Sequence, residues 1–186
     1  VLAGAGILFV SVGMFDLLPY RLSAPPFKLP PAIGDLVYLV FLAATAAGVV
    51  SGRAVDRFGP RGVILGVAVV GIGCLLVGIL PSLPAVVLAA AGGISGTVAL
   101  HVAHSGAAAR HGRAAVGYYL AAYYVGGAAS APLMAAAYQR WGWAAVMFSL
   151  AGAWLVVALL AAARHDPDRP QGQRADADVT PAGTLG

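Results

Sequence analysis

The sequence predicts an all-α fold, a polytopic membrane bundle of six transmembrane helices. Of its 186 residues, 60% are hydrophobic and only 10% are charged, and seven Asp are the only acids. The mean hydropathy is +0.87. A water-soluble domain of this size needs far more charge to cover its surface. Lipid must therefore surround this chain.

The bundle is expected to occupy residues 1–163. A spanning helix needs about 20 mostly apolar residues, and six runs come close to this length. The expected spans are about 2–18, 33–52, 62–80, 84–107, 114–137 and 142–163. The first span is short and contains Asp16.

Each connector between these spans carries turn chemistry. Five prolines crowd the first connector, from Pro19 to Pro31, and proline cannot continue a helix because it lacks an amide donor. The second connector, Gly52–Arg61, is short and charged. The later connectors hold Pro81 and Pro84, then Arg110 to Arg113, then Gln139 to Gly142.

The basic residues predict the orientation, because cytoplasmic loops carry an excess of Lys and Arg. With alternate connectors assigned to opposite sides, three basic residues fall on one side: Arg21, Lys28 and Arg140. The other eight of the eleven fall on the opposite side: Arg53, Arg57, Arg61, Arg110, Arg113, Arg164, Arg169 and Arg174. We therefore expect both ends of the chain to be cytoplasmic.

The ends of the chain differ from its middle. Residues 164–186 are rich in Pro, Gly, Asp and Arg, so we expect a disordered cytoplasmic tail. The first residues begin an apolar run without an initiator Met or a basic segment, which suggests a fragment of a longer chain. The alternative is a true half-size protein. The basic residues form no stripe on one face, so no nucleic-acid binding is expected.

The connector Gly52–Arg61 has the composition of a gate. Its glycines allow a tight reversal. Asp56 has the chemistry to accept hydrogen bonds from helix-end amides, or to pair with an arginine in one conformation and separate in another. The alternative is that its arginines only enforce the membrane orientation.

The pattern GxxxDRxGxR in this connector resembles the signature loop of the major facilitator superfamily. The matching positions are Gly52, Asp56, Arg57, Gly59 and Arg61, whereas Pro60 stands where a basic residue is usual. Residues 20–59, 103–110 and 117–143 are similar to segments of bacterial inner-membrane efflux permeases of that superfamily. The resemblance covers about residues 1–163.

This resemblance implies a twelve-helix transporter of which the chain is the C-terminal six-helix half. It also implies alternating access and proton-driven export of a small molecule across the cell inner membrane, without a cofactor. The chain would then need an N-terminal half, missing here, or a second copy of itself as its partner.

Three ionisable residues within the apolar spans are candidates for an ion or substrate pathway, which such groups commonly mark. Asp16 is late in the first span, and its alternative is a wet position at the membrane surface beside Arg21. His101 and His104 are three residues apart and share a helix face. Histidine changes its charge near neutral pH, so it suits a proton relay. Hydrogen-bonded packing is the alternative for both. No metal-ligand spacing supports a metal site.

Tyrosines offer apolar area and a hydroxyl, which suit an amphipathic substrate. Tyr118 and Tyr119 are expected in the aromatic belt at the membrane surface. Tyr123 and Tyr124 lie deeper and are candidates for a substrate cavity. Pro132 follows in the same span and predicts a kink, either static or mobile.

Two other classes of function stay open. Gly93-Ile94-Ser95-Gly96 resembles the nucleophile motif of rhomboid intramembrane proteases, but the sixth span holds no histidine to act as the base. His101 and His104 follow Ser95 on its own helix and do not share its face. A non-catalytic membrane scaffold subunit is the other alternative.

Overall fold

The computed structural model describes residues 2–163 and, within that range, a bundle built of helices. Their order along the chain is α1 (Leu2–Ser23), α2 (Pro31–Gly34), the 3-10 helix η1 (Asp35–Leu39), α3 (Val40–Val77), α4 (Leu83–Ala109) and α5 (Arg113–Ala163). The expected tail at residues 164–186 lies outside the described residues. The expected class, an all-α membrane helix bundle, is confirmed.

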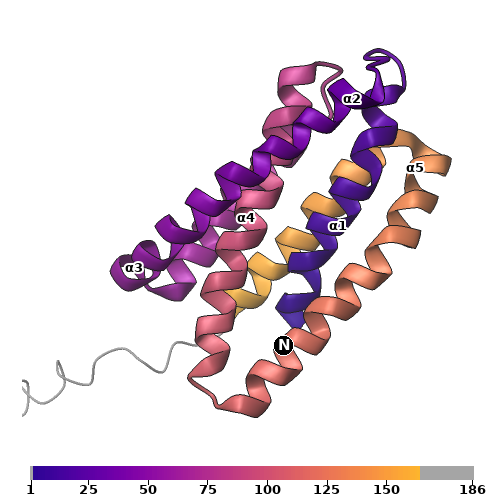
Figure 1. Ribbon diagram of the computed structural model, residues 1–186. Coiled ribbons are helices and arrows are strands. Elements are labelled where there is room, and N and C mark those ends of the chain that lie inside the picture. The colour runs from indigo at the N-terminus through magenta and orange to yellow at the C-terminus, as the bar shows by residue number, and fades with distance from the viewer. Residues whose placement is uncertain (1, 164–186) are drawn as a thin grey trace, which may run out of the picture.

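Four helices in the described part of the chain are long and apolar enough to cross a membrane. Two of them are too long to cross only once. The 38 residues of α3 and the 51 residues of α5 would measure about 57 and 77 Å if straight, against a hydrocarbon core of about 30 Å. Both helices turn back on themselves (Figure 1).

A single glycine makes each of these reversals. Gly59 has φ 73° and ψ 159°, and Gly142 has φ 74° and ψ −170°. Side chains disfavour a positive φ, so glycine is the residue that suits both turns. When the two arms of α3 and of α5 are counted separately, and α1 and α4 are added, the described bundle has six long helical segments.

Alternate connections lie at opposite ends of the bundle. The turn at Gly59 and the connection between α4 and α5 lie at the end where α1 begins and α5 stops (Figure 1). The connections after α1 and α3, and the turn at Gly142, lie at the other end.

The first helix is longer than the expected span at 2–18. It continues through Pro19 to Ser23, so the expectation that Pro19 ends the helix is wrong. Membrane helices tolerate proline more readily than soluble helices do. At the end of α1 the Ser23 hydroxyl donates to the carbonyl oxygen of Pro19 at 2.8 Å, and the Ala24 amide donates to that of Tyr20.

The gating connector also differs from the expectation. The first arm of α3 continues past Gly52 as far as the break at Gly59, so most of Gly52–Arg61 is helical. Gly52 has no positive φ, and a Cβ added there would meet nothing within 4 Å. Only one glycine of this segment, Gly59, is needed for the reversal.

Small residues hold the arms together. Trp154, on the second arm of α5, is fully buried, and its six-membered ring lies against Gly71 of α3 and Gly96 of α4. A Cβ at Gly71 would overlap this ring. Helices in lipid associate through such close van der Waals contact, because hydrocarbon provides no hydrophobic drive between them.

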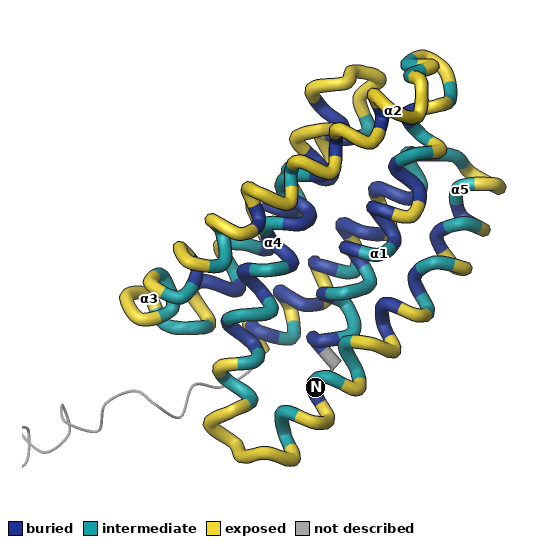
Figure 2. Tube along the Cα trace, in the orientation of Figure 1, coloured by how far each residue is buried: buried dark blue, intermediate teal, exposed yellow. Residues whose placement is uncertain are grey.

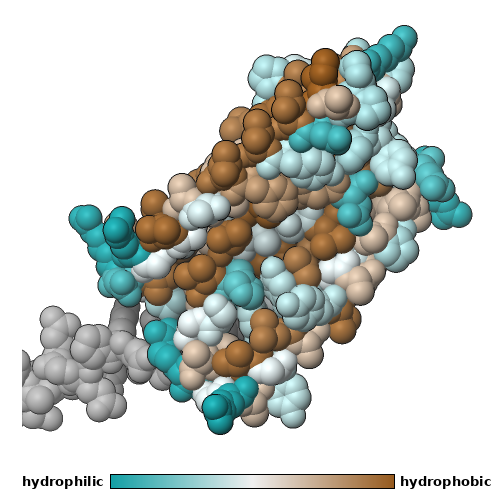
Figure 3. All heavy atoms as spheres, viewed as in Figure 1, coloured by the Kyte–Doolittle hydropathy of each residue, from teal (hydrophilic) through white to brown (hydrophobic). Residues whose placement is uncertain are grey.

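The outer faces remain apolar. Exposed residues follow the first arm of α3 over its whole length, whereas α1 and α4 hold much of the buried core (Figure 2). Hydrophobic side chains form a band across the visible face, and hydrophilic side chains gather toward its two ends (Figure 3). This is the surface pattern expected of a chain surrounded by lipid.

We predict that Gly96→Leu lowers the free energy of unfolding by about 1–3 kcal/mol, the usual effect of overpacking a core. The new side chain would collide with the Trp154 ring, because a Cβ at position 96 would already lie 3.0 Å from its Cζ3 atom. Thermal unfolding in detergent measures the effect. Gly73→Leu is the matched control, because nothing lies within 4 Å of a Cβ there. Equal melting temperatures for the two variants would contradict this packing.

Candidate transport site

Two helices bring five aromatic rings together inside the bundle. We call this group the ring cluster; it consists of His101 and His104 from α4 and Tyr119, Tyr123 and Tyr124 from α5. The two histidines are three residues apart, and Tyr119 and Tyr123 are four apart, so each pair shares a helix face. The connection at 110–112 turns these two faces toward each other.

Tyr119 is at the centre of the ring cluster. Its hydroxyl lies 3.0 Å from Nδ1 of His101, within hydrogen-bond distance. Its ring is stacked parallel to His104, with centroids 6.4 Å apart and 4° between the planes. A Cβ at Gly4 of α1 would lie 3.0 Å from the Tyr119 ring, so that glycine makes room for it.

The exposure of these rings increases along the cluster. Tyr119 is 3% exposed and His104 is 6% exposed, whereas Tyr124 is 65% exposed. His101 and Tyr123 lie between these extremes, and their ring centroids are 4.8 Å apart. Tyr123 meets Tyr124 edge to face at 5.5 Å. The cluster therefore connects the bundle core with an outer face.

His104 is held by its own helix. Its Nδ1–H donates to the carbonyl oxygen of Leu100 at 2.9 Å, because a carbonyl oxygen only accepts. A bond of this kind defines which ring nitrogen carries the proton. The cluster thus combines one fixed imidazole with a second imidazole, His101, that is bonded to a phenol. Hydroxyls and imidazoles in contact are groups that relay protons and bind polar parts of a small molecule.

Tyr119 does not lie where its place in the sequence predicts. Tyr118 is 67% exposed, and its place in the membrane-surface belt stays a prediction, whereas Tyr119 is only 3% exposed and packs inside the bundle. The spacing of four between Tyr119 and Tyr123, beside a histidine pair on the preceding helix, was the available signal. The contact with Gly4 could not be inferred from the sequence, since it joins residues far apart in the chain.

Asp16 stands apart from the ring cluster. It is exposed on α1, two turns before the end of that helix. Within the described residues no ion pair joins Asp16 to Arg21, and the wet position at the membrane surface stays a prediction. Arg21 instead donates to the carbonyl oxygen of Pro25 at 3.0 Å and lies over the ring of Phe27.

Pro132 lies within the first arm of α5 without interrupting it. In that helix the non-helical backbone angles are found at Gly142 alone. Nearby, the Ser130 hydroxyl donates to the carbonyl oxygen of Phe9 at 2.6 Å and joins α5 to α1. Pro132 itself is exposed.

The gating segment, Gly52–Arg61, has one long-range contact. Arg61 donates from Nη2 to the carbonyl oxygen of Ala162 at 2.7 Å. The last carbonyls of a helix lack partners within it and carry partial negative charge, so an arginine stabilises them. Arg57 lies over the ring of Phe58 at 5.3 Å. Asp56 is exposed and, within residues 2–163, has no hydrogen bond or ion pair.

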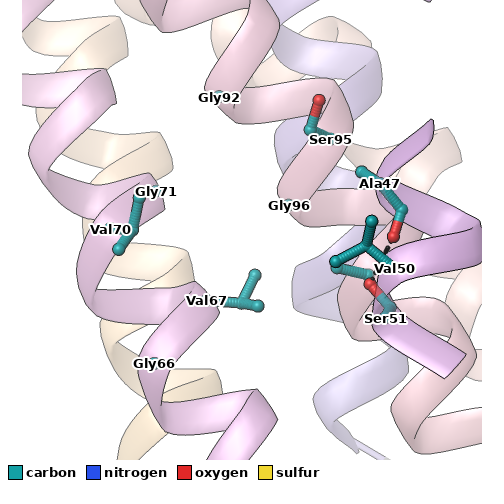
Figure 4. A pocket seen from close by; sticks show the side chains of 11 residues that line it. Ala47, Val50, Ser51, Gly66, Val67, Val70, Gly71, Gly92, Ser95 and Gly96 are labelled. Atoms are coloured by element: carbon teal, nitrogen blue, oxygen red, sulfur yellow. Dashed lines mark hydrogen bonds between the residues drawn. The ribbon is translucent and has the colours of Figure 1, made fainter. Parts of the chain in front are cut away.

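The protease alternative lacks its dyad in the described part of the chain. Ser95 lines a groove that α4 forms with α3 (Figure 4), whereas His101 contacts the tyrosines of α5. Within residues 2–163, no group of three or more His, Cys, Asp or Glu side chains could hold a metal ion.

A comparison with protein families matches residues 3–185 to the model of the Major Facilitator Superfamily. No curated protein and no solved structure matches the chain.

We predict that Arg61→Gln loosens the last turn of α5 while leaving the rest of the bundle intact. Loss of a charged cap at a helix end costs about 0.3–1 kcal/mol, which corresponds to roughly two- to fivefold faster amide exchange there. Hydrogen exchange over residues 158–163 measures this. Arg53→Gln removes the same charge from the other arm of α3 and should leave the exchange rate unchanged; a faster rate in both variants would reject the contact.

Proposed function

The chain belongs to the Major Facilitator Superfamily, and from this premise we propose that it is the C-terminal half of a transporter that exports a small molecule in exchange for protons. Its family makes it a membrane transporter. The direction, the coupling ion and the pairing of halves are our proposal. The ring cluster is the observation that carries it.

The ring cluster has the properties of a substrate and proton pathway. It is a group of hydroxyls and imidazoles within an otherwise apolar bundle. Placing polar groups in such surroundings costs free energy, and for this reason such groups commonly mark substrate or ion pathways. Its exposure rises from Tyr119 to Tyr124. A molecule that reaches Tyr124 from outside the bundle would next meet Tyr123 and His101.

The exposed face of the bundle supports the pairing of two halves. The apolar window of the span that contains α3 is only 28% buried. Transporters of two repeats commonly place their site between the repeats and rock one against the other. We propose that an N-terminal six-helix half, or a second copy of this chain, covers this face and completes the cavity.

We propose that the membrane is the cell inner membrane and that both ends of the chain are cytoplasmic. The distribution of basic residues supports this orientation. Within the described residues, the end of the bundle with the Gly59 turn has five of them: Arg53, Arg57, Arg61, Arg110 and Arg113. The opposite end has Arg21, Lys28 and Arg140. An excess of this kind is typical of the cytoplasmic side.

The full-length protein in proteoliposomes tests the exchange reaction. A ligand is first identified by its thermal shift of the purified protein, and its movement is then followed with and without an imposed proton gradient. Faster movement with the gradient supports the proposal. An equal rate of ligand movement with and without the gradient would reject proton coupling. The absence of any ligand-dependent shift in melting temperature would favour the scaffold alternative.

Tyr123→Ala should weaken binding of that ligand about tenfold, because loss of one aromatic contact and its buried area costs roughly 1–2 kcal/mol. Isothermal titration measures the dissociation constant. Tyr118→Ala, on the same helix and outside the ring cluster, is the matched control. Unchanged affinity in Tyr123→Ala would remove this residue from the site.

Asp56→Ala should slow transport at least threefold and change ligand affinity little. Asp56 is exposed in this conformation, and a gating carboxylate exerts its effect in the conformation in which it is paired. The maximal rate of transport and the dissociation constant are measured side by side. Asp35→Ala, at the opposite end of the bundle, is the control. A parallel loss of rate and affinity would argue against gating.

A further inference from the structure

A groove of about 300 Å³ lies between the two arms of α3 and α4 (Figure 4). The first arm contributes Ala47, Val50 and Ser51, the second arm Gly66 and Val70, and α4 contributes Ser95. The Ser51 hydroxyl is occupied, since it donates to the carbonyl oxygen of Ala47 at 2.6 Å. The walls are therefore almost entirely apolar.

The groove opens to the surroundings of the bundle. Val50 on the first arm and Val70 on the second arm are 62% and 67% exposed. Gly66, on the second arm, is also exposed. Where no partner half covers it, this opening faces hydrocarbon in a membrane. Its apolar walls suit a hydrocarbon chain.

Basic residues stand at one end of the groove. Arg57 follows Val50 by seven residues, which is about two turns, so it lies on the same face about 10 Å nearer the Gly59 turn. Arg53 lies two residues after Ser51 on the same arm. The side chains of Arg53 and Arg57 are both exposed. Arg61 is engaged with Ala162. Since Asp56 is the one acid of this turn, its net charge is positive.

Phe58 is exposed and lies beside these arginines, next to the Gly59 turn. A Cβ at Gly62, on the second arm, would lie 3.6 Å from the Cβ of Phe58. Arg57 lies over the Phe58 ring, with 5.3 Å between the guanidinium carbon and the ring centroid. The apolar slot and the exposed arginines thus lie on the same arm, about 10 Å apart along the helix.

We propose that this groove binds an anionic phospholipid, with one acyl chain between α3 and α4 and the headgroup phosphate against Arg53 and Arg57. Basic residues at a membrane surface attract anionic lipids, and basic pockets between membrane helices bind their headgroups. The inference does not depend on which substrate the protein transports or in which direction.

The chain contains a reporter for such an occupant. The six-membered ring of Trp154 lies against Gly71 and Gly96, and both glycines line the groove. A bromine atom on an acyl chain in the groove would therefore come close enough to quench Trp154 fluorescence. Subtracting the spectrum of Trp154→Phe from that of the parent isolates the Trp154 signal from other tryptophans.

The test titrates the full-length protein in detergent with brominated phosphatidylglycerol, and in parallel with phosphatidylcholine of the same chains. Phosphatidylglycerol should quench Trp154 at a lower concentration. Arg53→Gln with Arg57→Gln should raise the half-quenching concentration about fivefold for each arginine lost. The double variant Arg110→Gln and Arg113→Gln is the control. It removes the same charge from the connection between α4 and α5 and should change the half-quenching concentration little.

A second pair of variants tests the slot without altering charge. Gly66→Leu should abolish quenching, because nothing lies within 4 Å of a Cβ at Gly66 and the new side chain would occupy the groove without a clash. Gly152→Leu, on α5, is the control. Nothing lies within 4 Å of a Cβ at Gly152 either, and the lipid should quench Trp154 in this variant as it does in the parent. Melting temperatures confirm that both variants fold.

Four results would overturn the proposal. Equal quenching by the two lipids would mean that the groove only contacts bulk hydrocarbon. The absence of quenching by either lipid in the folded protein would mean that a protein segment covers the groove. Unchanged quenching in Gly66→Leu would place the bromine elsewhere. Competition by inorganic phosphate alone, without an acyl chain, would show an ion site and likewise reject a bound lipid.

Discussion

Close approach of small residues is the constraint on which this bundle depends. In hydrocarbon the helices gain little by burying apolar area, so they must touch closely enough for van der Waals contact and interhelical hydrogen bonds. Gly126 of α5 lies directly against the backbone of Ala5 in α1, and Gly127 lies against Leu8. Ser130 bonds the backbone of α1 at the same contact. This contact determines the spacing of the other helices.

The ring cluster is a product of that spacing. Tyr119 can enter the core only because Gly4 offers no side chain at the facing position of α1. Once there, its hydroxyl meets His101 and its ring covers His104. The packing of an apolar bundle thus places two imidazoles and a phenol in contact, which is how the scaffold and the proposed pathway are connected.

Much of the architecture could be predicted from the sequence, because membrane spans depend on local properties. Apolar length predicts the class of fold, and the signature between Gly52 and Arg61 predicts the family, which the family comparison confirms. The failures also have local causes. Pro19 lies inside α1, because proline does not by itself end a membrane helix.

The site was less predictable, because its members meet across the chain. The histidine pair and the tyrosine pair each follow helical spacing, but nothing in the sequence says that α4 and α5 turn these faces together. The same holds for Arg61 and Ala162, which are 101 residues apart. Whether Asp16, Tyr124 or Pro132 takes part in transport stays a prediction.

The one-residue turns at Gly59 and Gly142 have a mechanical consequence. A long loop would let two neighbouring helices slide past each other along their axes, but a hinge of a single residue permits almost no such sliding. The two arms of α3, and likewise the two arms of α5, must therefore travel together as stiff forks. Any large rearrangement of this bundle has to be a tilt of whole forks, with slack available in the longer connections: the proline-rich segment between α1 and α2, residues 78–82 and residues 110–112.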